Sequence, residues 1–181
     1  MKSLSILALI AVLLFACKLC SFTGNNNKPA PTPTPTPEPL MYAADILKTR
    51  LGSFTLSKIR TREEVLKSVS SEPAVRKLVD HASDTAIGSY KSENGEVVLL
   101  WVFSYPNPGL AESAFDDSEK DMQGSHRWRN VKTTTLAHGR RIEGTDSKSR
   151  AAVIWTNGYW FFWAWSDNPG LTNSFVDSVG Y

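Results

Sequence analysis

The sequence predicts an α+β domain over residues 40–181, with helices packed on a mostly antiparallel sheet of six or seven strands that includes two ββα units. Apolar runs bounded by turn residues recur along this part of the chain, as in strands joined by hairpins. The tetrapeptide Asn-Pro-Gly-Leu occurs twice, at 107–110 and 168–171, each time after a strand-like run. Each copy leads into a segment whose apolar residues have helical spacing.

The first part of the domain predicts one short strand and two helical segments. Residues 54–59 carry apolar side chains at strand-like spacing. Thr61 is followed three residues later by Glu64, which is the pattern of a capping box at a helix start. Pro73 is tolerated only in the first turn of a helix, so a second helical segment is expected to begin there.

Three hairpins are predicted further along the chain. The first spans 85–105 and turns at Asn94-Gly95, where a type I′ turn requires positive φ at both central residues. Its second strand, 97–103, is apolar on both faces, which indicates a central strand covered on both sides. The second hairpin bends at His138-Gly139, and the third turns at Asn157-Gly158.

The two Asn-Pro-Gly-Leu segments are interpreted as strand-to-helix connectors. Asn107 and Asn168 are good N-cap residues, and proline at the first helical position loses no hydrogen bond. A helix N-terminus also binds anions, but neither segment is glycine-rich or followed by Lys. Helices are therefore expected over 108–122 and 169–179.

The first residues predict export and anchoring. Lys2 precedes an uncharged apolar run over 4–16, which is shorter than the roughly 17–25 residues of a membrane-spanning helix and fits a signal peptide. The sequence Leu-Phe-Ala-Cys at 14–17 resembles the lipobox of bacterial lipoproteins that carry small envelope domains. The resemblance implies a signal peptide over 1–16, lipid attachment at Cys17 and a place in the cell envelope, on the periplasmic side or the cell surface.

Residues 17–39 predict a spacer between the lipidated Cys17 and the domain. Alternating Pro and Thr favour extended polyproline II structure. The two cysteines of the chain are Cys17 and Cys20. The domain itself therefore has no thiol for a disulfide, a zinc site or a nucleophile.

Charge and motifs exclude several functions for the domain. Three of the 20 Lys and Arg and one of the 18 Asp and Glu precede residue 40, so the domain carries 17 of each and is neutral. A neutral domain has no general attraction for nucleic acid. His81, His126 and His138 lack the spacing of a metal site, and no nucleophile or dinucleotide motif is present. The sequence thus predicts no metal, no cofactor and no enzyme activity.

Two charged groups have alternative interpretations. The carboxylates at 116, 117, 119 and 121 fall opposite an apolar helical stripe, which indicates a solvated face. The cations around 126–130, with Arg140, Arg141, Lys148 and Arg150, either protect a sheet edge or bind an anionic polymer or lipid.

The aromatic strand 159–165 carries the strongest functional signal. Tyr159, Phe161, Trp163 and Trp165 share one face, while Trp160 and Phe162 share the other. We expect the Phe161 and Trp163 face to be core. The other face is expected to be buried under helices over 61–80 or else to bind a ligand or partner, and the candidate surface residues are Trp160, Phe162, Trp128, Arg140 and Arg141.

Three functions follow. The first is a membrane-tethered, non-catalytic interaction or accessory module whose partner is an envelope protein or cell-wall polymer. The second is a binder of a sugar or small apolar ligand at 159–165. The third is a hydrolase with an unrecognised site, which contact between His126, His138 and a carboxylate would favour.

Overall fold

A computed structural model describes residues 42–69 and 73–180 of the chain. The predicted signal peptide (1–16), Cys17 and the linker (17–39) lie outside the described residues. The described elements all belong to one structural unit, Leu40–Tyr181.

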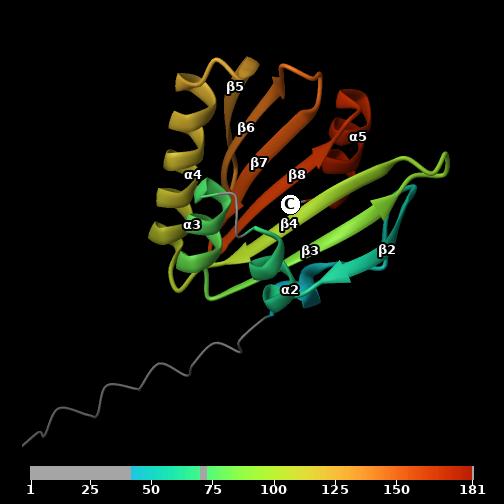
Figure 1. The fold of residues 1–181 in the computed structure, drawn as a ribbon, viewed down its shortest axis with the longest axis horizontal. Coiled ribbons are helices and arrows are strands. Elements are labelled where there is room, and N and C mark those ends of the chain that lie inside the picture. Colours follow the sequence, from blue (N-terminus) through green and yellow to red (C-terminus); the bar gives the residue numbers. More distant parts are fainter. Residues whose placement is uncertain (1–41, 70–72, 181) are drawn as a thin grey trace, which may run out of the picture. The chain divides into compact units, whose positions relative to one another are not determined.

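The strands form a single antiparallel sheet of eight strands in the order β1-β2-β3-β4-β8-β7-β6-β5 (Figure 1). The α+β class is confirmed. The predicted count of six or seven strands is one short, because a two-residue strand is too brief to show alternation. The strands are β1 (Arg50–Leu51), β2 (Phe54–Arg60), β3 (Asp84–Lys91), β4 (Val97–Ser104), β5 (Trp128–Leu136), β6 (Gly139–Asp146), β7 (Ala151–Asn157) and β8 (Trp160–Ser166).

Helices cover both faces of the sheet (Figure 1). One face, called the α4 face, packs against α2 (Arg62–Ser68), α3 (Pro73–His81) and α4 (Pro108–Gly124). The opposite face, called the α5 face, packs against the 3-10 helix η1 (Ala43–Ile46) and α5 (Pro169–Val179). Among the described residues, no helix is long and apolar enough to cross a membrane.

Each face has its own hydrophobic core. On the α5 face, Phe162 is 1% exposed and stacks on Trp155 with ring centroids 5.0 Å apart. On the α4 face, Phe161 is fully buried with Phe103 and Phe115. The prediction that helices over 61–80 cover Trp160 and Phe162 is therefore wrong, since those helices lie on the Phe161 face. Sequence alternation separates two faces but does not say which helix covers which.

The two Asn-Pro-Gly-Leu connectors are confirmed. The side-chain oxygen of Asn107 accepts a hydrogen bond from the Leu110 N–H at 3.0 Å, and that of Asn168 accepts one from Leu171 at 3.3 Å. Proline follows each cap in the first helical turn. The two ββα units are β3-β4-α4 and β7-β8-α5, and their helices lie on opposite faces of the sheet.

The predicted hairpins are present, but the type I′ turn predicted at Asn94-Gly95 is wrong. Gly95 has φ of 81° while Asn94 stays at negative φ, and the Gly95 N–H donates to the Ser92 carbonyl at 2.9 Å. That is a tight turn followed by one left-handed glycine. In the third hairpin Asn157 pairs with Trp160, so the turn begins at Gly158, with φ of 59°.

Candidate functional site

The helices cover the two faces of the central strands unequally. On the α5 face of β4 and β8, Leu100, Val102 and Phe162 are buried. On the α4 face the same strands leave Trp101 and Trp163 partly exposed, together with Leu99 and Trp165. These four residues are called the aromatic stripe. A half-covered run of indole rings is the kind of apolar surface that ligands and partners use.

The rings of the aromatic stripe are held in fixed positions by one another. Trp101 stacks on Trp163 with centroids 5.6 Å apart and an interplanar angle of 25°. Trp101 also stacks on Phe103 at 6.0 Å. The Arg150 guanidinium lies over the Trp165 ring at 5.1 Å. The stripe is therefore a preorganised surface, which lowers the entropic cost of binding to it.

A cavity of about 390 Å³ continues from the aromatic stripe and lies between α3, α4 and the sheet. Trp163 belongs to both the stripe and the cavity. Strands β5, β7 and β8 supply Trp128, Ile154 and Trp163 to its lining. The other apolar residues of the lining come from the two helices: Ala74, Val75, Leu78, Leu110, Ala114 and Met122. The volume is within the range of sites for small ligands, about 300–1,000 Å³.

The polar groups of the cavity wall are largely occupied by the protein itself. The Tyr105 hydroxyl donates to the Leu78 carbonyl at 3.4 Å, and burial raises the pKa of this phenol well above its usual value. The Ser118 hydroxyl donates to the Ala114 carbonyl at 2.8 Å.

Two indole nitrogens beside the cavity are exceptions. Within the described chain, the N–H groups of Trp128 and Trp163 are buried and have no hydrogen-bond partner. Leaving such a donor unpaired costs about 1–3 kcal/mol. Native domains rarely keep unpaired buried donors without a reason beyond packing.

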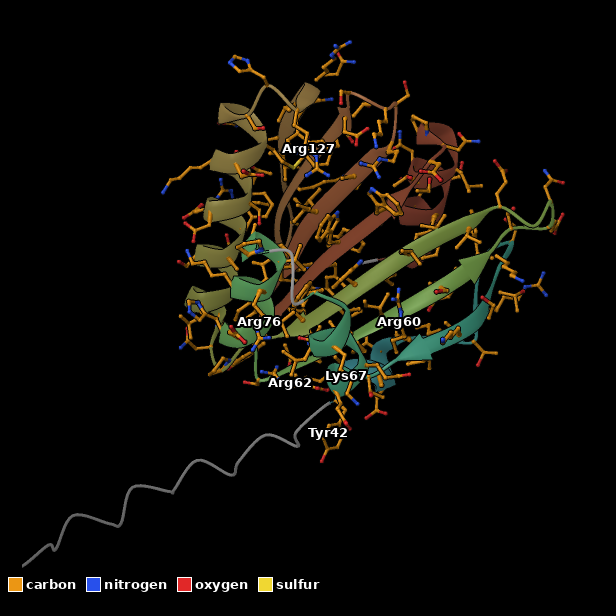
Figure 2. All side chains as sticks on the ribbon, in the orientation of Figure 1. Tyr42, Arg60, Arg62, Lys67, Arg76 and Arg127 are labelled. Atoms are coloured by element: carbon orange, nitrogen blue, oxygen red, sulfur yellow. The ribbon has the colours of Figure 1, made fainter. Side chains whose placement is uncertain are left out.

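Charged side chains surround the mouth of the cavity. Lys77 of α3 pairs with Asp117 of α4 at 2.7 Å, so an ion pair joins the two helices. The hydrogen bond from Lys77 holds the pKa of Asp117 below its usual range. Lys120, Asp121, Arg127 and His81 complete this rim. Figure 2 places Arg127 between the end of α4 and β5, and its guanidinium lies over the Trp128 ring at 5.4 Å.

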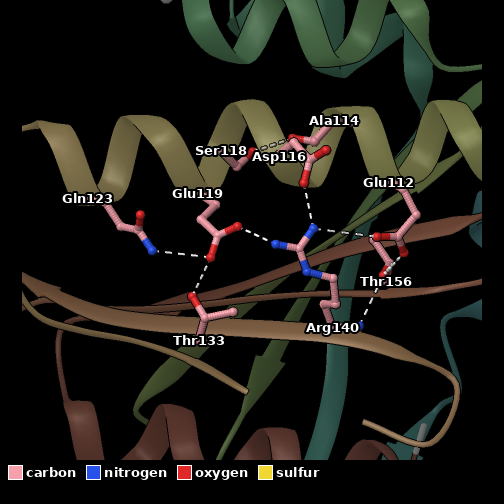
Figure 3. A network of polar contacts seen from close by, with 9 residues as sticks. All are labelled: Glu112, Ala114, Asp116, Ser118, Glu119, Gln123, Thr133, Arg140 and Thr156. Atoms are coloured by element: carbon pink, nitrogen blue, oxygen red, sulfur yellow. Dashed lines mark hydrogen bonds and ion pairs between the residues drawn. The ribbon is translucent and has the colours of Figure 1, made fainter. Parts of the chain in front are cut away.

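Arg140 fastens α4 to the sheet rather than forming part of a basic surface (Figure 3). Its guanidinium bonds to Asp116 at 2.5 Å and to Glu119, and it lies over the Phe115 ring at 4.5 Å. The hydrogen bond with Asp116 raises the pKa of Arg140, so this arginine stays charged. The Thr156 hydroxyl donates to Glu112 at 2.5 Å in the same network. Of the four carboxylates predicted on a solvated face, Asp116, Asp117 and Asp121 are exposed, whereas the Glu119 side chain is only 17% exposed and pairs with Arg140.

The other predicted cations do not join Arg140 in one patch. Arg141 is the next residue on β6, so it points to the α5 face, where it bonds to Glu143 at 3.0 Å and approaches Asp177 at 3.8 Å. Arg150 pairs with the buried Asp146 at 2.6 Å. Burial alone would raise the pKa of Asp146, but hydrogen bonds from Arg150 and the backbone outweigh it and lower the pKa to about 2. Arg141 and Arg150 are therefore paired within the fold and do not form a shared basic surface with Arg140.

Of the predicted aromatic surface residues, one lies at the cavity and two do not. Trp128 lines the cavity. Phe162 is buried in the core of the α5 face, so it offers no surface in this structure. Trp160 is partly exposed and packs against that same core. Sequence reasoning missed Trp101 and placed Trp163 in the core, because alternation does not show how far a helix extends over a strand.

The histidines are not gathered in one place. His81 lies at the cavity mouth, while His126 and His138 are exposed. Across residues 42–69 and 73–180, no group of three or more His, Cys, Asp or Glu side chains is arranged to hold a metal ion.

Comparison with known proteins adds little to this description. No family model matches the chain, and no curated protein matches it. A solved structure described as a GTP binding regulator from Thermotoga maritima aligns with a TM-score of 0.49 and 18% sequence identity. The alignment covers 76% of this chain and 81% of that chain. No function is transferred at this level of similarity.

Proposed function

We propose that residues 40–181 are the non-catalytic binding module of a lipid-anchored envelope protein, and that the cavity between α3, α4 and the sheet is its binding site. The observation that carries this proposal is the cavity of about 390 Å³ with its largely apolar lining. An apolar, well-formed cavity with a few convergent polar groups is the usual form of a small-molecule site.

The unpaired indole groups support a binding role over simple packing. Core packing alone favours side chains without polar atoms, or tryptophans whose N–H reaches a partner. Trp128 and Trp163 have neither property in this structure. The large rings are better explained as a flat apolar surface for a bound molecule.

The anchoring part of the proposal rests on the sequence. Leu-Phe-Ala-Cys at 14–17 and the Pro/Thr-rich linker before residue 40 would hold the domain near a membrane surface. A binding module at that position would meet molecules that leave or enter the bilayer or the cell wall.

Binding of the neutral apolar dye Nile red tests the cavity. We expect saturable fluorescence enhancement by the domain 40–181, and we expect Val75→Trp to abolish it, because Val75 lines the cavity and a larger side chain would fill it. The matched control is Val97→Trp, since Val97 is 43% exposed on β4 and does not line the cavity. Circular dichroism and urea melts would verify that both variants fold. Equal dye binding by the two variants would contradict the proposal.

A second candidate function is docking of an envelope protein or cell-wall polymer on the aromatic stripe. The partial exposure of Trp101 and Trp165 outside the cavity favours it. Capture of a crosslinked partner that is lost in Trp101→Ala but kept in Val75→Trp would select this function over small-ligand binding.

A further inference from the structure

We infer that the ligand of this cavity is an anionic amphiphile with a single apolar chain, such as a medium-chain fatty acid. This inference rests on the proposed function and specifies the ligand class for the same site. It follows from the charge of the rim, the engagement of the Tyr105 and Ser118 hydroxyls within the wall, and the size of the cavity.

The rim carries an excess of positive charge. Lys77 and Asp117 neutralise one another at 2.7 Å. Lys120 and Arg127 then face a single further carboxylate, Asp121. Among the described residues, neither Lys120 nor Arg127 forms an ion pair. Because the domain as a whole is neutral, this excess is local to the mouth and would favour an anionic group there.

The interior disfavours a sugar. Sugar sites combine aromatic rings with side chains that bond to several hydroxyl groups. Here the hydroxyls of Tyr105 and Ser118 already donate to backbone carbonyls, and the third hydroxyl of the lining belongs to Ser113, which is exposed. The indole nitrogens of Trp128 and Trp163 are sealed from solvent by the surrounding atoms. A ligand with many hydroxyls would lose its hydrogen bonds to water without replacing them. An alkyl chain makes no hydrogen bonds to water, so it would not incur this cost.

The size of the cavity limits the ligand to one chain. A volume of about 390 Å³ lies near the lower end of the range for ligand sites. Such a cavity would take one short acyl chain, with its head group left at the mouth beside Lys120 and Arg127. A two-chain lipid would not fit inside it.

Displacement of Nile red by three probes that share a twelve-carbon chain, each kept below its micellar concentration or solubility limit, tests the inference. The probes are dodecanoate, its uncharged methyl ester and dodecylammonium. We expect dodecanoate to displace the dye at the lowest concentration. In a series from octanoate to dodecanoate, each added methylene should tighten binding by up to about fourfold. Comparable affinity for the ester or for dodecylammonium would overturn the inference.

Variants of the rim give an independent readout. We expect Lys120→Gln and Arg127→Gln each to weaken dodecanoate binding by up to about fivefold, the upper end of what one solvent-exposed ion pair contributes, and to leave binding of the ester unchanged. Lys132→Gln is the matched control, because Lys132 is exposed on β5 and does not line the cavity. Dodecanoate affinity that is equal in all three variants and the wild type would refute the role of the rim.

The outcomes separate the two proposals. If Nile red binds in the cavity but dodecanoate does not displace it, the ligand class is wrong and the binding site stands. If Nile red does not bind, the proposed function itself fails.

Discussion

Replacing Phe162 by Ala tests whether the α5 face of the sheet is a buried core. Phe162 is 1% exposed, stacks on Trp155 at 5.0 Å, and lies in the core that α5 covers. Removing a fully buried phenylalanine ring leaves a cavity and costs about 3–5 kcal/mol. With an m-value of about 2 kcal/mol per molar urea, a loss of about 4 kcal/mol would lower the unfolding midpoint by about 2 M.

The neighbouring variant Trp160→Ala is the control for this measurement. Trp160 lies on the same face but is partly exposed, so we expect a smaller loss of about 1 kcal/mol. Urea melts followed by circular dichroism at 222 nm give both values without depending on the changed tryptophan signal. A midpoint shift below about 0.5 M for Phe162→Ala would refute the burial that the structure assigns to this face. A shift for Trp160→Ala that is larger than the shift for Phe162→Ala would refute it as well.

Three further predictions concern the connectors, the buried ion pair and the anchor. Asn107→Ala and Asn168→Ala should each lower the free energy of unfolding by about 1 kcal/mol and leave Nile red binding unchanged; lost binding at unchanged stability would make the connectors functional. Because its folded pKa of about 2 is below the usual value, charged Asp146 stabilises the fold above about pH 4, and this contribution should disappear as the pH falls towards 2. Asp146→Asn should be less stable at pH 7 and should flatten that part of the pH profile; an unchanged profile would contradict the shift. Cys17→Ser should move the protein from the detergent phase to the aqueous phase of a detergent extraction, whereas aqueous partitioning of the wild type would refute lipid anchoring.

Local signals in the sequence were sufficient to predict most of the helices and strands of the fold. The Asn107 and Asn168 caps depend on side chains within three residues, so their geometry follows from the tetrapeptide. The same is true of Pro73 at the start of α3. Strand β1 could not be predicted, because two residues carry no periodicity.

The site depended on long-range packing and was therefore only partly predictable. Sequence alternation placed Trp163 and Phe161 on one face, but it gave no sign that α4 covers Phe161 fully and Trp163 only in part. Arg140 and Arg141 were grouped by adjacency, although neighbours in a strand point to opposite faces. The partners of Arg140 come from a helix more than twenty residues earlier, which spacing alone does not reveal.

The indole N–H signals of the six tryptophans in a ¹H–¹⁵N correlation spectrum would test the binding site most directly. Titration of ¹⁵N-labelled domain with dodecanoate should shift the signals of Trp128 and Trp163, which lie at the cavity and lack hydrogen-bond partners within the described chain. The signal of Trp155, buried on the α5 face, should stay in place. Shifts confined to Trp155 or Trp160 would contradict a binding site between α3, α4 and the sheet, and no shift at Trp163 when dodecanoate is in excess would contradict the proposed ligand class.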